Sequence, residues 1–453
     1  MFVGRKDEIN RLEEIYRADT SSIVVLYGRE KIGKTALALH FAAGKKFMYY
    51  EAVDGLEDLQ AEMLCKAFDS EKGSVSEVVR EKLESLGEGK KIVVFDEFHL
   101  MAQHGSLLSQ VLVDLLQTAK EGLAGGPVMI VLISSSVRWV ENDMVESMGA
   151  VARLISGFIK LGELSFQSIV RMLPKTPVSD CVLVKAVLGG VPGLIGQWRE
   201  TLSSRDNIIR LLLSDGAILA HEAEHLLKTE LRELPCYNRI LYAMATGRTK
   251  MNDIYNMTGF SRAKISVYIK NLIHMGIAEK VFSYDDSGHE NLKKGLYRIK
   301  DPFIAFYYAF VFPNRSLLAL QKAGKVYDEI VAPKLDGLLR PYFADVCREF
   351  LQLMSDYGKL GARFTDYRSW HGKQGTIDII ATGEGGASIA ALCVYRAGDA
   401  VEEDFEELKE LSKQAGINPG QFYLFAKTGF DAGLKKIAES SGNSLKLVSL
   451  GDL

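Results

Sequence analysis

The feature that most constrains this chain is the segment Gly28-Arg29-Glu30-Lys31-Ile32-Gly33-Lys34-Thr35. The apolar, β-branched run Ile23–Tyr27 precedes it and predicts a buried parallel strand, while the stretch from Ala36 onward favours a helix. Glycines let the backbone of such a loop turn its N–H groups toward phosphate oxygens, and the helix N-terminus adds partial positive charge. The sequence therefore predicts a strand–loop–helix phosphate site of the P-loop type, formed by residues Gly28 to Ala36.

The residue types also predict a role for each polar side chain of the site. We expect Lys34 to reach the β- and γ-phosphates of ATP as a point charge and the Thr35 hydroxyl to bind Mg²⁺. A second mainly apolar run, Lys91–Phe95, is followed directly by Asp96 and Glu97. Asp96 is predicted to hold the magnesium through water, and Glu97 to orient and polarise the attacking water as a general base.

Two polar features close to these motifs have an open interpretation. The run Val128–Ile133 predicts a third strand, and Ser134, Ser135 and Ser136 follow it. One of these serines either senses the γ-phosphate or the water, or caps a helix, which is a frequent use of serine. His99 is interpreted as a turn residue beside the site rather than as a catalytic group.

Further segments resemble those of known families. Phe2-Val3-Gly4-Arg5 with Glu8 and Leu12 resembles the opening of AAA+ and STAND-type ATPases. In those families the segment packs beside the adenine, which implies such a place for Val3 and Arg5.

The stretch Leu188–Gly193 resembles the Gly-x-Pro element of STAND-type lid domains and implies that Pro192 lies near the nucleotide base. Its alternative interpretation is a plain turn between helices.

Arg153, placed before Leu161-Gly162-Glu163-Leu164-Ser165-Phe166, resembles an arginine in a family of archaeal and bacterial P-loop ATPases. The resemblance implies that it completes the phosphate site like an arginine finger. A surface ion pair is the alternative interpretation.

The middle of the chain predicts a helical lid over residues 161–230 and a winged helix-turn-helix over residues 231–300. The expected helices are 237–244, 251–257 and 261–276, and the expected hairpin strands 277–284 and 295–299 enclose a turn at 285–294. Between Leu234 and Lys300 there are eleven Lys or Arg and five Asp or Glu residues. This module has two candidate partners. Another protein is the favoured interpretation, and duplex DNA contacted by Arg262, Lys264 and Lys270 is the alternative.

The last part of the chain resembles a nuclease fold that lacks part of its chemistry. Residues 301–335 predict an aromatic helical connector, and residues 336–453 resemble a PD-(D/E)XK nuclease-like α/β domain. Asp378 matches one metal-binding carboxylate, but Tyr395 ends the strand where a Glu-x-Lys triplet is expected, and Ala344 stands where a helical glutamate is expected. One carboxylate does not assemble a catalytic metal site, so a binding or assembly role is favoured over an active nuclease.

Composition agrees with an α/β protein of several domains. The net charge of the 453 residues is −3, so contact with nucleic acid requires a local basic patch. The N-terminus has no apolar leader and the longest apolar run is too short to cross a bilayer, so we expect a cytoplasmic protein without a membrane partner. The combined prediction is a P-loop ATPase core at residues 1–160 that binds ATP or ADP with Mg²⁺ and acts as a conformational switch. An ATP-gated DNA-binding regulator or defence protein is the alternative, and the oligomeric state is left open.

Overall fold

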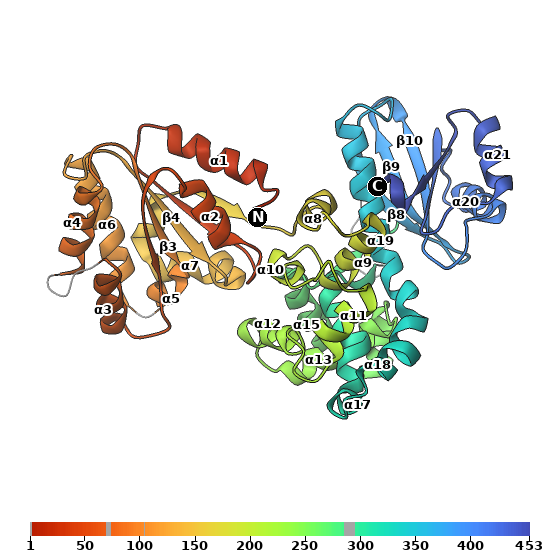
Figure 1. Cartoon of the computed structure of the whole chain (residues 1–453), viewed down its shortest axis with the longest axis horizontal. Coiled ribbons are helices and arrows are strands. Elements are labelled where there is room, and N and C mark those ends of the chain that lie inside the picture. Colours follow the sequence, from red (N-terminus) through yellow and green to blue (C-terminus); the bar gives the residue numbers. More distant parts are fainter. Residues whose placement is uncertain (1, 69–73, 104, 285–294) are drawn as a thin grey trace. The chain divides into compact units, whose positions relative to one another are not determined.

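The chain folds into two compact units, which are described separately. The computed structural model describes residues 2–453 except 69–73, 104 and 285–294 (Figure 1). The first unit contains Met1–Leu164 together with Val191–Gly193, and the second contains Ser165–Gly190 and Leu194–Leu453. The predicted lid, winged helix, connector and C-terminal domain thus pack as one unit, except for residues 161–164 and the short turn Val191–Gly193.

The first unit is built on a parallel sheet of five strands in the order β2-β3-β4-β1-β5. The three inner strands are buried along almost their whole length, as expected for strands covered on both faces. The strands are β1 (Ser22–Tyr27), β2 (Lys46–Glu51), β3 (Lys91–Asp96), β4 (Val128–Ser134) and β5 (Ile155–Lys160). This topology is that of a P-loop NTPase, which confirms the predicted fold class.

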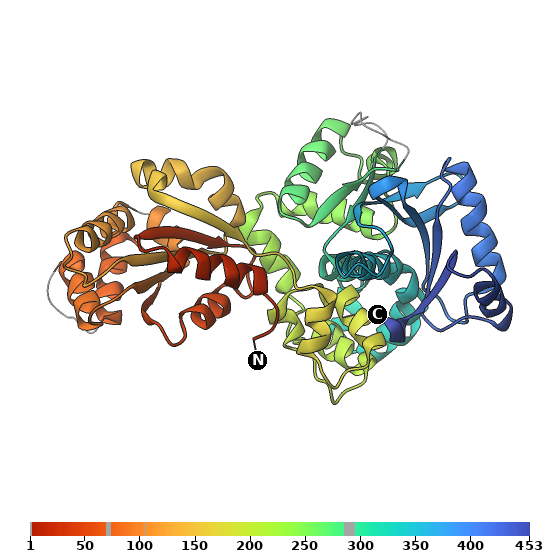
Figure 2. The same ribbon diagram turned by 90° about the horizontal axis from the view of Figure 1, so that it is seen from above.

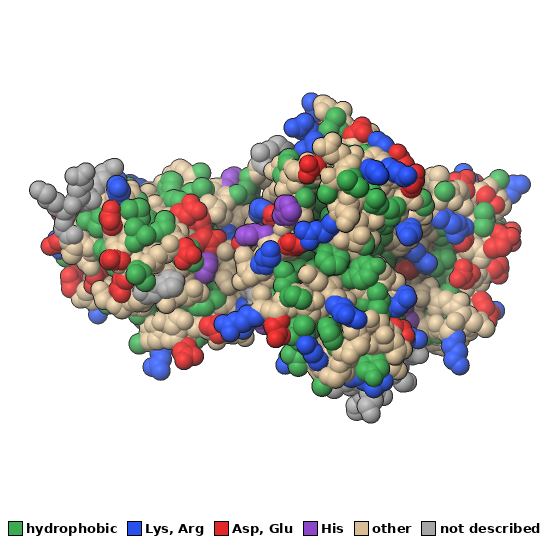
Figure 3. Space-filling view, turned by 90° about the horizontal axis from the view of Figure 1, so that it is seen from below, with side chains coloured by type: hydrophobic (Ala, Val, Ile, Leu, Met, Phe, Trp, Pro, Cys, Tyr) green, Lys and Arg blue, Asp and Glu red, His purple; other side chains and the backbone are tan. Residues whose placement is uncertain are grey.

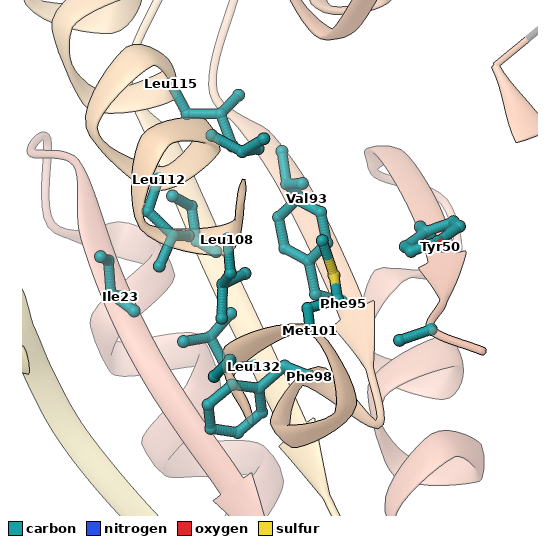
Figure 4. Packing of buried hydrophobic residues seen from close by; sticks show 14 of the residues in the cluster. Ile23, Tyr50, Val93, Phe95, Phe98, Met101, Leu108, Leu112, Leu115 and Leu132 are labelled. Carbon is teal, nitrogen blue, oxygen red and sulfur yellow. The ribbon is translucent and has the colours of Figure 1, made fainter. Parts of the chain in front are cut away.

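Helices cover both faces of this sheet. One face packs against α1 (Lys6–Arg17) and α2 (Lys34–Ala42), whose side chains Leu12, Leu37 and Phe41 are buried. The other face forms a large apolar cluster with the remaining helices, in which leucines of α6 lie over Val93 and Leu132 (Figure 4). These helices are α3 (Glu57–Ala67), α4 (Val75–Ser85), α5 (Phe98–Gln103), α6 (Leu107–Lys120) and α7 (Met144–Met148).

The second unit begins with helices packed around one central apolar helix. Almost every residue of α9 (Val178–Leu188) from Cys181 onward is buried, because it contacts α8, α16 and α19 on different sides. A helix that is apolar all round has to be enclosed in this way. The other helices of this part are α8 (Phe166–Met172), α10 (Pro192–Ile195), α11 (Ser204–Ile208) and α12 (Glu222–Glu230).

Three helices and a hairpin follow where the sequence predicts them. They are α13 (Leu234–Ala245), α14 (Met251–Thr258), α15 (Arg262–His274), β6 (Ala278–Val281) and β7 (Leu296–Ile299). The predicted turn at 285–294 lies outside the described residues. Ser261 caps α15, because its hydroxyl accepts a hydrogen bond from the Lys264 N–H at 3.3 Å. Arg298 on β7 binds both carboxylate oxygens of Asp345 at 2.9 and 3.1 Å and so fixes this hairpin to α19.

The predicted aromatic connector is core structure. It consists of α16 (Pro302–Phe306), a π-helical turn (Tyr307–Val311), and the short helices α17 (Arg315–Ala319) and α18 (Ala323–Val326). Its aromatic residues Phe303, Phe306 and Tyr308 are fully buried.

The chain ends in a mixed sheet of five strands in the order β12-β11-β10-β9-β8. Strands β8 to β10 are antiparallel neighbours, and β10, β11 and β12 run parallel. The long helix α19 covers one face, while α20 and α21 cover the other (Figures 1 and 2). The elements are α19 (Ala332–Asp356), β8 (Phe364–His371), β9 (Thr376–Gly383), β10 (Ser388–Val394), α20 (Glu402–Gln414), β11 (Gln421–Ala426), α21 (Ala432–Ser440) and β12 (Leu445–Ser449).

Among the residues that the structure describes, no helix has the length and apolar character needed to cross a membrane.

Candidate nucleotide site

The predicted phosphate loop connects β1 to α2 at the carboxyl edge of the sheet. Gly33 precedes α2 with φ of 95°, a left-handed conformation that glycine adopts without strain. Gly28 is required by close approach, because a Cβ there would lie 2.7 Å from the carbonyl oxygen of Leu161. Hydrogen bonds from Gly28 N to Ser134 O (3.3 Å) and from Leu161 N to Tyr27 O (2.7 Å) hold the start of the loop between β4 and β5.

The lysine of the loop is buried among acidic groups. Lys34 is 5% exposed, and its Nζ donates to the carbonyl oxygen of Arg29 at 3.1 Å. Burial lowers the pKa of Lys34, while the negative charges of Glu97, Asp96 and Glu30 act in the opposite direction. The predicted phosphate cation and both predicted acidic residues are therefore brought together.

Asp96 lies at the end of β3 and has several hydrogen-bond donors. Its Oδ2 accepts from the Thr35 hydroxyl at 2.5 Å and from the Tyr49 hydroxyl at 3.0 Å, and its Oδ1 accepts from the Glu97 N–H at 2.9 Å. Burial and the neighbouring Asp96 raise the pKa of Tyr49, so its hydroxyl stays protonated. The sequence analysis did not single out Tyr49. The signal was available in the alternation of β2, where Met48 and Tyr50 are buried and Tyr49 faces the other way.

The side-chain oxygens of Thr35 and Asp96 suit Mg²⁺. A hydroxyl and a carboxylate are hard oxygen ligands, and Mg²⁺ bound to nucleotide takes the rest of its shell from phosphates and water. Within the described ranges, no group of three or more His, Cys, Asp or Glu side chains is placed to hold a metal ion. A magnesium–nucleotide site does not need such a group, so the residues present fit this ion.

Glu97 is held in place by the end of the neighbouring strand β4. Its Oε2 accepts from the Ser135 N–H at 2.9 Å and from the Ser135 hydroxyl at 2.7 Å. Glu97 has φ of 49°, a left-handed conformation that costs a non-glycine residue on the order of 1 kcal/mol. Such strain is typical of a residue that the surrounding structure holds for function.

His99 and Ser134 complete this polar group. His99 Nδ1 lies 3.3 Å from Glu97 Oε2 and 3.1 Å from the Ser134 hydroxyl. Burial is the main cause of a lowered pKa for His99. The serines at the end of β4 thus contact His99 and Glu97, while Ser136 donates its N–H to the Ser134 hydroxyl at 3.2 Å.

Two segments predicted to lie near the base contact the loop itself. The Gly193 N–H donates to the Lys31 carbonyl oxygen at 3.0 Å, and Pro192 Cγ would lie 3.8 Å from a Cβ at Gly33. Arg5 donates to the Ile32 carbonyl oxygen at 3.0 Å and pairs with Glu8 at 3.2 Å. Arg5 therefore braces the loop backbone, and Val3 lies half-buried two residues before it.

The structure does not bring Arg153 to the phosphate loop. Arg153 is exposed and lies just before β5, whose first residue Ile155 pairs with Ile23 at the start of β1. The loop leaves the opposite end of β1, after Tyr27, which pairs with Lys160. Because β1 and β5 are parallel, Arg153 is at the amino edge of the sheet and does not complete the site of its own chain.

The carboxylate predicted from nuclease resemblance is engaged by other groups. Asp378 Oδ2 accepts from the Cys393 N–H at 2.8 Å and lies 3.4 Å from a guanidinium nitrogen of Arg340. Burial raises the pKa of Asp378 despite Arg340. A nuclease-like origin of this domain remains a prediction.

Comparison with known proteins gives a family match for the N-terminal region. Residues 2–197 match a family described as an ATPase domain predominantly from Archaea. The N-terminal region belongs to this family of P-loop ATPases. Residues 307–404 match a second family, described as archaeal and bacterial proteins of unknown function. The ATPase family match includes the loop, Asp96, Glu97 and Pro192.

Individual relatives are similar over different lengths. An uncharacterised protein of Methanocaldococcus jannaschii is 28% identical over an alignment of 462 residues, which covers 100% of both sequences. A Walker-type ATPase of Pyrococcus abyssi is similar in structure with a TM-score of 0.45 and 20% identity, covering 68% of this chain and 96% of its own. A signal-transduction ATPase with numerous domains from Pyrococcus horikoshii gives a TM-score of 0.26 and 14% identity. The match covers 79% of this chain and 50% of that protein.

Proposed function

We propose that this protein is a Mg²⁺-dependent ATPase that converts ATP and water to ADP and phosphate and uses the nucleotide state as a conformational switch. The observation that carries this proposal is the Glu97 carboxylate. The Glu97 backbone has a positive φ, its carboxylate accepts from both donors of Ser135, and the residue lies next to Asp96 in the candidate site. A protein that only binds ATP has no need of a water-orienting carboxylate at this place.

Each residue of the site has a role in this proposal. The N–H groups of the loop and the Lys34 ammonium bind the β- and γ-phosphates. Thr35 and Asp96 hold magnesium, which neutralises phosphate charge when it is bound. Glu97 orients the attacking water and accepts its proton, and its two bonds to Ser135 keep the carboxylate in one position.

The turn Val191–Gly193 supports the switch. It packs with the first unit, although the residues on either side of it belong to the second unit. Gly193 binds the backbone of Lys31 inside the phosphate loop. A change in the loop that follows ATP binding or hydrolysis therefore acts directly on a turn that continues into α9 and α10.

The test compares phosphate release and nucleotide binding in Glu97→Gln. The amide oxygen of glutamine still accepts from Ser135 but has no basicity, so we expect turnover to fall by about 10²-fold or more with unchanged ATP affinity. Glu141→Gln is the matched control, because Glu141 binds Tyr27 and Lys160 at the neighbouring strand ends. Equal turnover of the wild type and Glu97→Gln would refute the proposal.

A second candidate function is nucleotide-gated binding of duplex DNA by α15. This helix contains no acidic residue, and Arg262, Lys264 and Lys270 are all exposed on it. The same helix also exposes Val267 and Ile273, which favours protein docking, the main role proposed for this module. Figure 3 shows Lys and Arg side chains interspersed with acidic and apolar ones on one face of the molecule.

The two partners are distinguished by salt dependence. If α15 contacts DNA phosphates, the affinity for a labelled duplex falls steeply with salt, and Lys264→Ala with Lys270→Ala reduces the slope. Lys228→Ala on α12 is the control for loss of an exposed lysine. No binding at low salt, with or without ATP, would exclude this function.

In this proposal, Arg153 acts in hydrolysis only if it reaches the nucleotide site of a second copy of the chain. We propose that Arg153→Ala leaves the turnover of a monomer unchanged, since the residue lies at the opposite edge of its own sheet. In an oligomer, mixing Arg153→Ala with Glu97→Gln restores turnover if each supplies what the other lacks. Loss of turnover in a protein that sediments as a monomer would contradict this.

A further inference from the structure

Tyr49 lies on strand β2, beside the strand that carries Asp96. The register pairs Tyr49 with Val94 and Glu51 with Asp96. Met48 and Tyr50 belong to the buried cluster on one face of the sheet. Because side chains alternate along a strand, Tyr49 and Glu51 point to the other face, on which Thr35 and Asp96 meet.

The Tyr49 hydroxyl completes the set of donors around a buried carboxylate. Asp96 is 2% exposed, so bulk water does not solvate it. Its Oδ2 accepts from Thr35 at 2.5 Å and from Tyr49 at 3.0 Å, while the Glu97 N–H holds Oδ1 at 2.9 Å. A carboxylate has about four acceptor positions, so three donors fix its orientation and leave one position for a further partner.

We propose that Tyr49 is a positioning residue of the magnesium site, which holds Asp96 so that its remaining acceptor position receives a water of bound magnesium. This inference rests on the proposed function. Thr35 is the residue expected to bind the ion, and a hydroxyl bound to magnesium still donates its proton to Asp96. Without Tyr49, the Thr35 hydroxyl is the one side-chain group among the described residues that donates to Asp96 Oδ2, and the carboxylate has more freedom to turn.

The hydroxyl of Tyr49 also lies 3.5 Å from Glu51 Oε2. Glu51 is exposed, so this second contact is weak and adds little to the stability of the fold. The main effect of removing the hydroxyl is therefore expected at Asp96. Groups that orient metal-binding residues in this way typically change metal affinity by about 10- to 100-fold when removed.

The experiment compares Tyr49→Phe with Tyr50→Phe by titrating a fluorescent ATP analogue, N-methylanthraniloyl ATP, in EDTA and over a range of Mg²⁺ concentrations. Tyr50 is the matched control, because its hydroxyl binds Gln60 on the opposite face of the same strand. For Tyr49→Phe we expect unchanged affinity in EDTA and a half-saturating Mg²⁺ concentration raised by about ten-fold or more. Tyr50→Phe is expected to change neither.

A second readout separates positioning from a merely structural role. In Tyr49→Phe, phosphate release recovers at high Mg²⁺, so the KM for Mg²⁺ rises while kcat stays near that of the wild type. An unchanged Mg²⁺ requirement, or an equal loss of affinity in EDTA and in Mg²⁺, overturns the role of Tyr49 alone. Failure of the wild type to bind the analogue under any condition overturns the proposed function and this inference together.

Discussion

The contact between the turn Val191–Gly193 and the phosphate loop predicts a large effect of one methyl group. In Gly193→Ala the new Cβ would lie 2.7 Å from Lys31 Cβ and 3.1 Å from Lys31 O. Both atoms are fixed by the loop backbone, so rotation of a side chain does not relieve the contact. The turn has to retreat by roughly 1 Å to reach an ordinary separation of carbon atoms.

The magnitude follows from two terms. Retreat weakens the hydrogen bond from Gly193 N to Lys31 O, which is worth about 1 kcal/mol. Overpacking costs about 1–3 kcal/mol, part of which is relieved by the movement. A net loss of about 2 kcal/mol in docking of the turn corresponds to a factor of about 30. Since Pro192 moves with the turn, we expect ATP affinity to fall by between about three-fold and 30-fold.

The assay is titration with N-methylanthraniloyl ATP in Mg²⁺, with thermal unfolding of the nucleotide-free protein as a check on folding. Gly162→Ala is the matched control, because it lies between β5 and α8, has no positive φ, and no atom lies within 4 Å of its added Cβ. An affinity of Gly193→Ala within two-fold of that of Gly162→Ala would refute the reasoning, because the turn would then be irrelevant to the site.

Two further predictions concern stability. The pKa of His99 is lowered in the folded protein, mainly by burial and also by Lys34, against the opposing charges of Glu97, Asp96 and Asp54. The unfolded chain therefore binds the proton first, so stability of the first unit falls as pH drops below about 6.5, and His99→Gln should lessen this fall in thermal unfolding between pH 7.5 and 5.5. An undiminished pH dependence in that variant would assign the effect to other groups. In the second unit, Arg298→Met leaves Asp345 paired with Arg348 at 2.8 Å, but it removes the guanidinium that binds both oxygens of Asp345 and one oxygen of Glu279. We expect a loss of about 3 kcal/mol in denaturant unfolding, and a change below about 0.5 kcal/mol would show that the pair is solvated.

The predictions for the first unit share a physical basis: contacts from neighbouring segments hold the phosphate loop and the charged residues around it. Lys34, Asp96 and Glu97 carry the charges of the site, but their positions depend on Ser135, Tyr49 and the turn at Gly193. Variants of these three supporting positions are therefore more informative than variants of the charged residues alone. They separate nucleotide binding, metal binding and hydrolysis, which a substitution of Lys34 removes together.

Much of the fold was predictable from local patterns. The spacing of Gly28, Gly33 and Lys34 identified the phosphate loop, because this spacing between a strand and a helix is typical of P-loops. Apolar runs identified β1, β3 and β4, since buried strands need continuous or alternating apolar residues. Strand β8 was missed because Phe364–His371 is mostly polar and only partly buried. Strand β5 was missed because it lies at the sheet edge, where half of its residues are exposed and no continuous apolar run is needed.

The sequence by itself determined which residues have the chemistry for nucleotide binding, since Lys34, Thr35, Asp96 and Glu97 lie in motifs readable along the chain. Tertiary structure alone decided which side chains meet. The strand order β2-β3-β4-β1-β5 places Tyr49 beside Asp96 and Ser135 beside Glu97. The parallel register of β1 and β5 puts Arg153 at the far edge. The physical reason is that motifs are local, whereas sheet order and register depend on burying apolar faces formed by segments far apart in the chain.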